Sequence, residues 1–203
     1  MANENSRERV LANKLNKAGY AALFQYGERN MADSIWQKGE NKDTLKKIAD
    51  SSEFEDYTRL LASEVLFAKD TNYPPNELFN KLAALYSRAL KMSGGDDQFF
   101  IPANQWGYMY FSDKGGIKDY GVLGNHLLFF GKAVIPHLIS LLNNDANMLY
   151  EGSQEAMIGN DQKYRIKDAA AYYIGKVANM PVRFYDDYTE RDTEIERLKE
   201  KLK

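Results

Sequence analysis

The side chains best suited to acid–base or metal chemistry are two histidines and the carboxylates that could join them. His126 and His137 are the only histidines of the chain, and Asp119, Asp168 or Glu155 would have to complete a metal site. A ligand pair spaced His-x-x-x-His or Glu-x-x-His is absent from the sequence. A glycine and a proline also interrupt the helix that would carry both histidines on one face. We therefore expect two structural histidines and no bound metal.

Other catalytic patterns are equally weak. The chain has no cysteine, which excludes thiolate ligands, a cysteine nucleophile and disulfides. It has no Gly-x-Ser-x-Gly elbow, and its Gly-Gly pairs do not precede the Lys-Ser/Thr of a phosphate loop. Among 29 acidic residues, nothing singles out a pair for glycoside chemistry. We predict a protein that is not an enzyme and has no cofactor. A hydrolase with a metal-independent or His/carboxylate site that no motif reveals is the alternative.

Composition limits the partners. With 203 residues, 44% hydrophobic and 28% charged, the chain is an ordinary globular sequence. Its net charge of −2, with both signs interspersed, lacks the basic surface that nucleic acid requires. No apolar run approaches the roughly 20 residues of a membrane span. The polar start, residues 1–7, predicts a cytoplasmic protein. The alternative is a periplasmic lipoprotein whose export signal has been removed.

The elements that position these residues are predicted to be helices. In the N-terminal part, apolar residues at helical spacing predict helices over 6–25, 31–38, 45–49, 57–68 and 78–90. Ser52 and Glu55 have the spacing of a capping box ahead of the fourth helix. Pro74-Pro75 separates the fourth helix from the fifth, which Gly94-Gly95 ends. Because the connection is short, we expect these two helices to pack as an antiparallel hairpin.

The segment 99–125 is dense in aromatic residues, with proline and glycine nearby. Aromatic residues favour pleated surfaces, so a short β-hairpin near 99–111 is one interpretation. An irregular connector, whose rings fill the groove between helical units, is the other. We favour the connector.

Two stretches of the C-terminal part resemble the paired helices of a HEAT repeat. Residues 132–145, KAVIPHLISLLNND, resemble its first helix, with a proline near the start and a small polar cluster at the end. Residues 164–177, YRIKDAAAYYIGKV, resemble the second, with an aliphatic-basic pair, an alanine cluster and then Ile-Gly. Alanines also permit the close helix contact that stacked hairpins need. The chain is thus similar to HEAT-like (ARM-type) proteins of bacteria, with an unusual insertion over 146–162.

This resemblance and the helical periodicity together predict an all-α fold. We expect irregular stacked antiparallel helical hairpins, related to the HEAT/ARM α-α superhelix, in a single helical domain over 1–203. One repeat cannot bury its own face, so earlier helices must supply the neighbouring layers. The expected subdivision is N-terminal helical pairs (1–98), a connector (99–125), a HEAT-like hairpin (126–180) and a charged C-terminal helix (181–203).

The insertion 146–162 is the strongest candidate for function, because long loops in helical stacks often bind partners. We expect partner-binding residues there and at the start of the following helix: Tyr150, Glu151, Glu155, Met157, Arg165 and Asp168. A loop that folds back as a structural cover is the alternative. The leading hypothesis is a non-catalytic protein-binding protein, in one version an immunity or inhibitor protein that binds a toxin or effector. A structural subunit of a bacterial envelope assembly is a further alternative.

Overall fold

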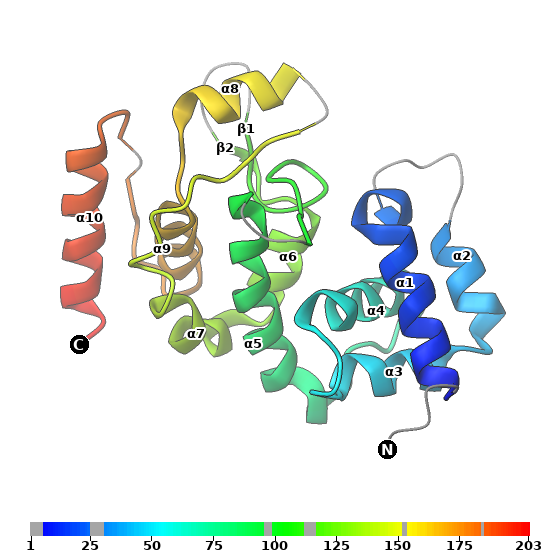
Figure 1. Ribbon diagram of the computed structural model, residues 1–203. Helices are drawn as coiled ribbons and strands as arrows, with labels where there is room; N and C mark the ends of the chain where they lie inside the picture. Colours follow the sequence, from blue (N-terminus) through cyan, green and yellow to red (C-terminus); the bar gives the residue numbers. More distant parts are fainter. Residues whose placement is uncertain (1–5, 25–30, 96–98, 112–116, 152–153, 184) are drawn as a thin grey trace. The chain divides into compact units, whose positions relative to one another are not determined.

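The computed structural model describes residues 6–24, 31–95, 99–111, 117–151, 154–183 and 185–203, and it confirms the predicted all-α fold (Figure 1). Within these residues the α-helices are α1 (Arg7–Phe24), α2 (Met31–Trp36), α3 (Lys42–Asp50), α4 (Asp56–Lys69), α5 (Phe79–Ala89), α6 (Val122–Phe129), α7 (Ile135–Ile139), α8 (Gln154–Gln162), α9 (Ile166–Val177) and α10 (Tyr188–Lys201). Short 3-10 helices are η1 (Gln37–Gly39), η2 (Asn76–Leu78), η3 (Leu90–Gly94) and η4 (Gly131–Val134), and the strands are β1 (Tyr110–Phe111) and β2 (Ile117–Asp119).

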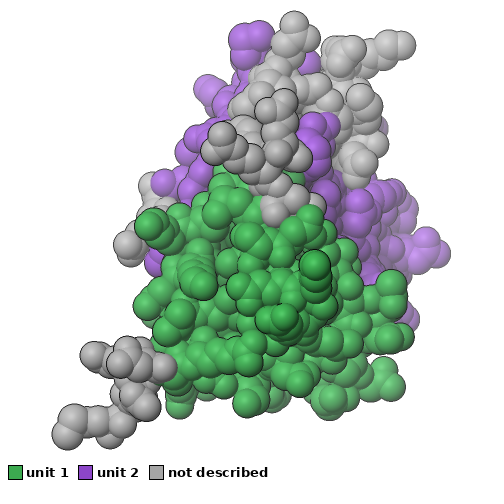
Figure 2. Space-filling model, turned by 90° about the vertical axis from the view of Figure 1, so that its right-hand side faces the viewer, with its two compact units in different colours: residues 1–81 green, residues 82–203 purple. Residues whose placement is uncertain are grey.

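The chain divides into two compact units, residues 1–81 and 82–203 (Figure 2). The division falls inside α5, whereas the subdivision expected from sequence placed its first boundary after residue 98. We refer to residues 1–81 as unit 1 and to residues 82–203 as unit 2.

Helix α4 is the centre of unit 1. Every residue from Tyr57 to Leu66 is buried, and the helix packs against α1, α2 and α3. The predicted antiparallel pairing of α4 with α5 would join residues of both units, and it stays a prediction. The neighbours of α4 come from the preceding three helices, and α5 belongs to unit 2 from Leu82 onward.

Two local features of the helices in unit 1 differ from the prediction: a break inside α1 and the cap of α4. Helix α1 is broken at Gly19, whose φ of 72° is left-handed, and the freed amide of Tyr20 donates to the Tyr57 hydroxyl at 2.8 Å. The predicted capping box is absent. Helix α4 begins after Glu55, whose side chain makes no capping hydrogen bond, and the preceding turn is instead held by the Ser51 hydroxyl, which accepts from the amide of Glu53.

Helix α9 is the centre of unit 2 and confirms the helix predicted over 164–177. It packs against α6, α7 and α10, and the alanine cluster at 169–171 is buried as expected for close helix contact. Helix α10 lies beside α9 (Figure 1) and buries Ile195 and Leu198. Its N-terminus is capped by Asp187, whose carboxylate accepts from the amides of Thr189 and Glu190.

The predicted first helix of the HEAT-like pair is much shorter than 132–145. It consists of the 3-10 helix η4 followed by α7, which has 5 residues. After Ile139 the chain continues in turns in which each amide donates to the carbonyl three residues earlier. Its packing against α9 is nevertheless present. The insertion is also not a plain loop, since residues 154–162 form α8.

The aromatic connector contains strands, but later than predicted. The ladder of β1 and β2 is antiparallel and spans 110–119, whereas no strand occurs over 99–109. Those residues form irregular backbone: the Asn104 side chain accepts from the amides of Trp106 and Gly107, and Met109 has a φ of 54°. The irregular-connector interpretation therefore holds for 99–109.

Candidate functional site

The first half of the insertion is an extended segment held on both edges. The amide of Met148 donates to the carbonyl of Tyr164 at 2.7 Å, and the amide of Leu149 donates to the carbonyl of Ser93 at 2.8 Å. The carbonyl of Leu149 accepts from Ala103 at 2.8 Å. Three separate parts of unit 2 thus fix residues 146–149, so this half of the insertion is a structural cover.

Tyr150 connects this cover to α8. Its side chain is buried, and the backbone of Gly159 lies so close that an added Cβ would meet the ring at 2.5 Å. The Asn160 side chain bonds both backbone groups of Tyr150, accepting from its amide at 3.0 Å and donating to its carbonyl at 3.0 Å. Helix α8 is therefore seated on Tyr150 by a close ring contact and a two-point polar clamp.

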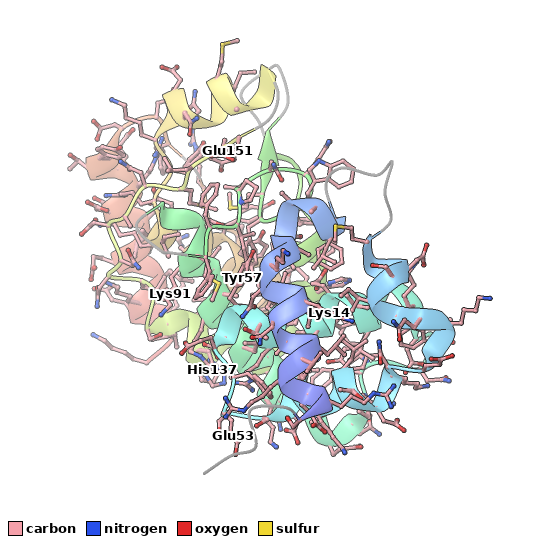
Figure 3. The ribbon with its side chains drawn as sticks, turned by 45° about the vertical axis from the view of Figure 1, so that its right-hand side comes forward. Lys14, Glu53, Tyr57, Lys91, His137 and Glu151 are labelled. Carbon is pink, nitrogen blue, oxygen red and sulfur yellow. The ribbon has the colours of Figure 1, made fainter. Side chains whose placement is uncertain are left out.

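Two other predicted residues of the insertion, Glu151 and Met157, are exposed, as is their neighbour Leu149. Met157 on α8 is 72% exposed, and Leu149 is 41% exposed. Glu151 is exposed and lies at the α8 end of unit 2 (Figure 3), where its carbonyl accepts from the Asn104 side chain at 3.2 Å. The side chain of Glu155 lies outside the described residues. We refer to the exposed side chains of Leu149, Glu151 and Met157 as the α8 surface.

Arg165 and Asp168 are brought together, but inside the molecule. The Arg165 guanidinium donates to the Asp168 carboxylate at 2.9 and 3.0 Å, and both residues are buried. Arg165 also pairs with Asp192 of α10 at 2.8 Å. Burial alone would lower the pKa of Arg165, but the hydrogen bonds that its guanidinium donates to Asp168 and Asp192 outweigh burial and raise that pKa above its ordinary value. In this structure the pair fastens α9 to α10 and offers no surface to a partner.

Sequence reasoning missed Arg191, the second arginine of this cluster. Its guanidinium is buried, donates to the carbonyls of Gln162 and Tyr185, and lies 4.3 Å from the centre of the Tyr164 ring. It is also 3.7 Å from Asp168. The only sequence signal was an arginine in the first turn of a helix, where a cation opposes the macrodipole and is unfavourable unless it has other partners.

The histidines stand apart from one another and from these groups. His126 contacts the Tyr86 ring edge-on, with ring centroids 6.0 Å apart. His137 lies on α7, at the opposite end of unit 2 from Glu151 (Figure 3). Among the described residues, no group of three or more His, Asp or Glu side chains is arranged to hold a metal ion.

No protein-family model, curated protein or solved structure matches this chain. Within the described residues, no single helix combines the length and apolar composition of a membrane span. The bent pair of α6 and residues 131–139 reaches that composition only when its two parts, 105° apart, are taken together.

Proposed function

We propose that the protein is a non-catalytic binding protein whose partner is another protein, and that the α8 surface makes the contact. The observation that carries this proposal is the 72% exposure of Met157 on a helix that is firmly seated. A flexible, polarisable methionine is a common contact residue at protein interfaces. A rigid support lowers the entropy that must be lost when such a side chain is ordered by a partner.

Charge also supports this choice of surface. Asp161 is exposed one turn after Met157 on α8, and Glu151 is exposed in the segment just before this helix, so the apolar residue has acidic neighbours in the chain. An acidic rim around an apolar centre suits a partner with a basic patch, because complementary charges speed encounter and fix orientation. A toxin or effector that acts on nucleic acid or on a phosphate-bearing substrate would present such a patch, and the immunity or inhibitor version of the proposal commits to it. The same proposal treats 126–180 as one atypical HEAT-like unit, supported by the contact of α7 with α9.

The test is site-specific photo-crosslinking in the native host. A photoreactive phenylalanine derivative is placed at Met157 and, as a matched control, at Ile139, which is 40% exposed on α7. We expect one discrete crosslinked protein from position 157 and none of that mass from position 139. A Glu151→Lys substitution should reduce the yield, because it reverses the charge of the rim.

A second arm separates the toxin version from general protein binding. The products of genes adjacent to this one are co-expressed with the protein, and growth is measured with and without the Met157→Ser substitution. Rescue of growth that Met157→Ser abolishes would support an immunity role. Equal crosslinking at both positions, or none at 157, would overturn the choice of the α8 surface.

A further inference from the structure

A cavity of about 270 Å³ opens beside the C-terminal end of α9 and shares no lining residue with the α8 surface. It is lined by Tyr172, Gly175, Lys176, Asn179, Pro181 and Val182. It exists because the chain turns back over α9 after the helix ends. The amide of Met180 donates to the carbonyl of Gly175 at 2.7 Å, and an added Cβ on Gly175 would meet the Met180 carbonyl at 2.5 Å. Only glycine allows this close return, so the cavity is a built feature of the fold.

The cavity lining includes one cationic side chain, that of Lys176, and two aromatic rings position it. The Lys176 ammonium lies 5.5 Å from the ring centre of Tyr120 and 5.5 Å from that of Tyr172. The two rings are themselves 6.0 Å apart and tilted by 32°. Contact with ring faces holds an ammonium in place while leaving its positive charge uncompensated by an anion. Among the described residues, no carboxylate lies within ion-pair distance of Lys176.

The remaining lining gives the cavity two chemical sides. Pro181, Val182 and the Tyr172 ring supply apolar surface, whereas Lys176 and the Asn179 amide supply hydrogen-bond donors. Asn179 has a φ of 54°, a backbone conformation that asparagine tolerates. Burial, followed by the effect of the neighbouring Tyr120, raises the pKa of the Tyr172 hydroxyl above its ordinary value. At neutral pH that hydroxyl is uncharged and does not act as a base.

We propose that this cavity binds a small organic carboxylate that carries an apolar group, with the carboxylate on Lys176 and the apolar group against Pro181 and Val182. The volume is near the lower end of ligand pockets, which limits the ligand to a few heavy atoms beyond its carboxylate. Such a mixed surface recognises charge and shape together: an inorganic anion would leave the apolar wall wet, and a neutral analogue would leave the ammonium unpaired. This site is independent of the proposed protein-binding surface.

The test is a titration of the full chain, labelled with nitrogen-15, with sodium benzoate, followed by amide signals in two-dimensional NMR. We expect saturable shifts confined to residues near 172–182. Benzamide, which is neutral and nearly isosteric, should bind roughly tenfold or more weakly, because the charge-assisted hydrogen bond is lost. Acetate and inorganic phosphate, which lack the apolar group, should also bind more weakly than benzoate.

Lys176→Met keeps the length of the side chain and removes its charge, so it should weaken benzoate binding by roughly tenfold or more. Lys132→Met is the matched control, because Lys132 is exposed on η4 and does not line the cavity. Asn179→Gly, which keeps the left-handed backbone accessible, gives a second variant that removes only the amide. Absence of benzoate shifts, equal binding of benzamide, equal or tighter binding of phosphate, or unchanged binding by Lys176→Met would each overturn the proposal.

Discussion

The Arg165 guanidinium and the Asp168 carboxylate form a closed pair at the start of α9. Two side-chain donors of Arg165 reach the two carboxylate oxygens at 2.9 and 3.0 Å, and the backbone amide of Arg165 donates to the same carboxylate at 2.9 Å. One acidic side chain thus caps the helix, neutralises a buried cation and lies 3.7 Å from a second one, Arg191. A carboxylate in a helix's first turn also complements the macrodipole.

Replacing Asp168 by asparagine should therefore be strongly destabilising. Asparagine keeps the shape but leaves the guanidinium groups of Arg165 and Arg191 buried without their shared anion, and breaking a buried pair costs about 3–5 kcal/mol. The free energy of unfolding is measured by urea denaturation followed by circular dichroism. Asp145→Asn is the control, since Asp145 pairs with Lys167 but is 71% exposed, and it should cost less than about 1 kcal/mol. Similar losses of unfolding free energy in the two variants would show that the buried Asp168 pair stabilises the protein no more than an exposed ion pair does.

This cluster shows what the sequence could and could not indicate. The helix over 164–177 followed from local periodicity, and Arg165 and Asp168, three residues apart, were adjacent candidates for that reason. Arg191 could not be assigned to them, because its place depends on how α10 docks on α9, a contact between segments that are distant in the chain. The packing of α4 depends in the same way on distant contacts: the helix is buried against α1, α2 and α3, which its own periodicity does not indicate.

Exposure within the insertion also could not be predicted residue by residue from the sequence. An aromatic residue in a long insertion looked accessible, yet Tyr150 is buried because Gly159 leaves room for its ring. The contact between Tyr150 and Gly159 forms only when α8 packs onto residues 146–149. The spacing of residues in the sequence therefore does not indicate it. Met157 was a sequence-predicted contact residue and is exposed, since it lies on the outer side of α8.

The docking of α10 should weaken in acid. Burial alone would raise the pKa of Asp192, but hydrogen bonds from Lys167 and Arg165 outweigh it and hold that pKa below its ordinary value. A carboxyl whose pKa is lowered by folding adds stability above its unfolded pKa of about 4 and loses it as pH falls through the folded value. The melting-temperature difference between wild type and Asp192→Asn should thus be present at pH 7 and shrink as the pH falls below the unfolded pKa.

The size of that difference should be modest, below about 1 kcal/mol at pH 7, because the Asp192 side chain is 46% exposed and its ion pairs are partly screened by water. Both proteins are compared at constant ionic strength, since salt also weakens exposed pairs. A difference that stays constant from pH 7 down to the acid limit of the folded protein would contradict a role for the ionised carboxylate.

Gly124→Ala should destabilise unit 2, although alanine favours helix by about 1 kcal/mol over glycine. The new Cβ would lie 2.2 Å from the hydroxyl oxygen of Tyr173, a fully buried side chain that donates to the carbonyl of Tyr120 at 2.7 Å. The ring has no free space to retreat into, so overpacking of about 1–3 kcal/mol and a weakened hydrogen bond should exceed the helical gain.

Thermal denaturation of two companion variants checks this explanation. Val122→Ala, at an exposed position in the first turn of the same helix, should be nearly neutral. Adding Tyr173→Phe to Gly124→Ala removes the clashing oxygen, so the double variant should be more stable than the sum of the two single losses implies. Simple additivity would show that the Tyr173 hydroxyl is not the obstacle.

Asn160→Ala should release α8 without unfolding the protein. The substitution removes both hydrogen bonds to the backbone of Tyr150, each at 3.0 Å, so the helix loses its polar clamp to this residue and keeps the Gly159 contact with the ring and the hydrogen bond from Arg191 to Gln162. Loss of these bonds should cost about 1–3 kcal/mol locally. Hydrogen exchange over 154–162 should therefore accelerate by about tenfold or more, while exchange in the centre of α9 stays slow.

Asp161→Ala, next along the same helix and exposed, is the matched control and should leave exchange unchanged. If rigid presentation of Met157 underlies binding, Asn160→Ala should also reduce crosslinking at position 157, and accelerated exchange with undiminished crosslinking would separate the clamp from the binding surface.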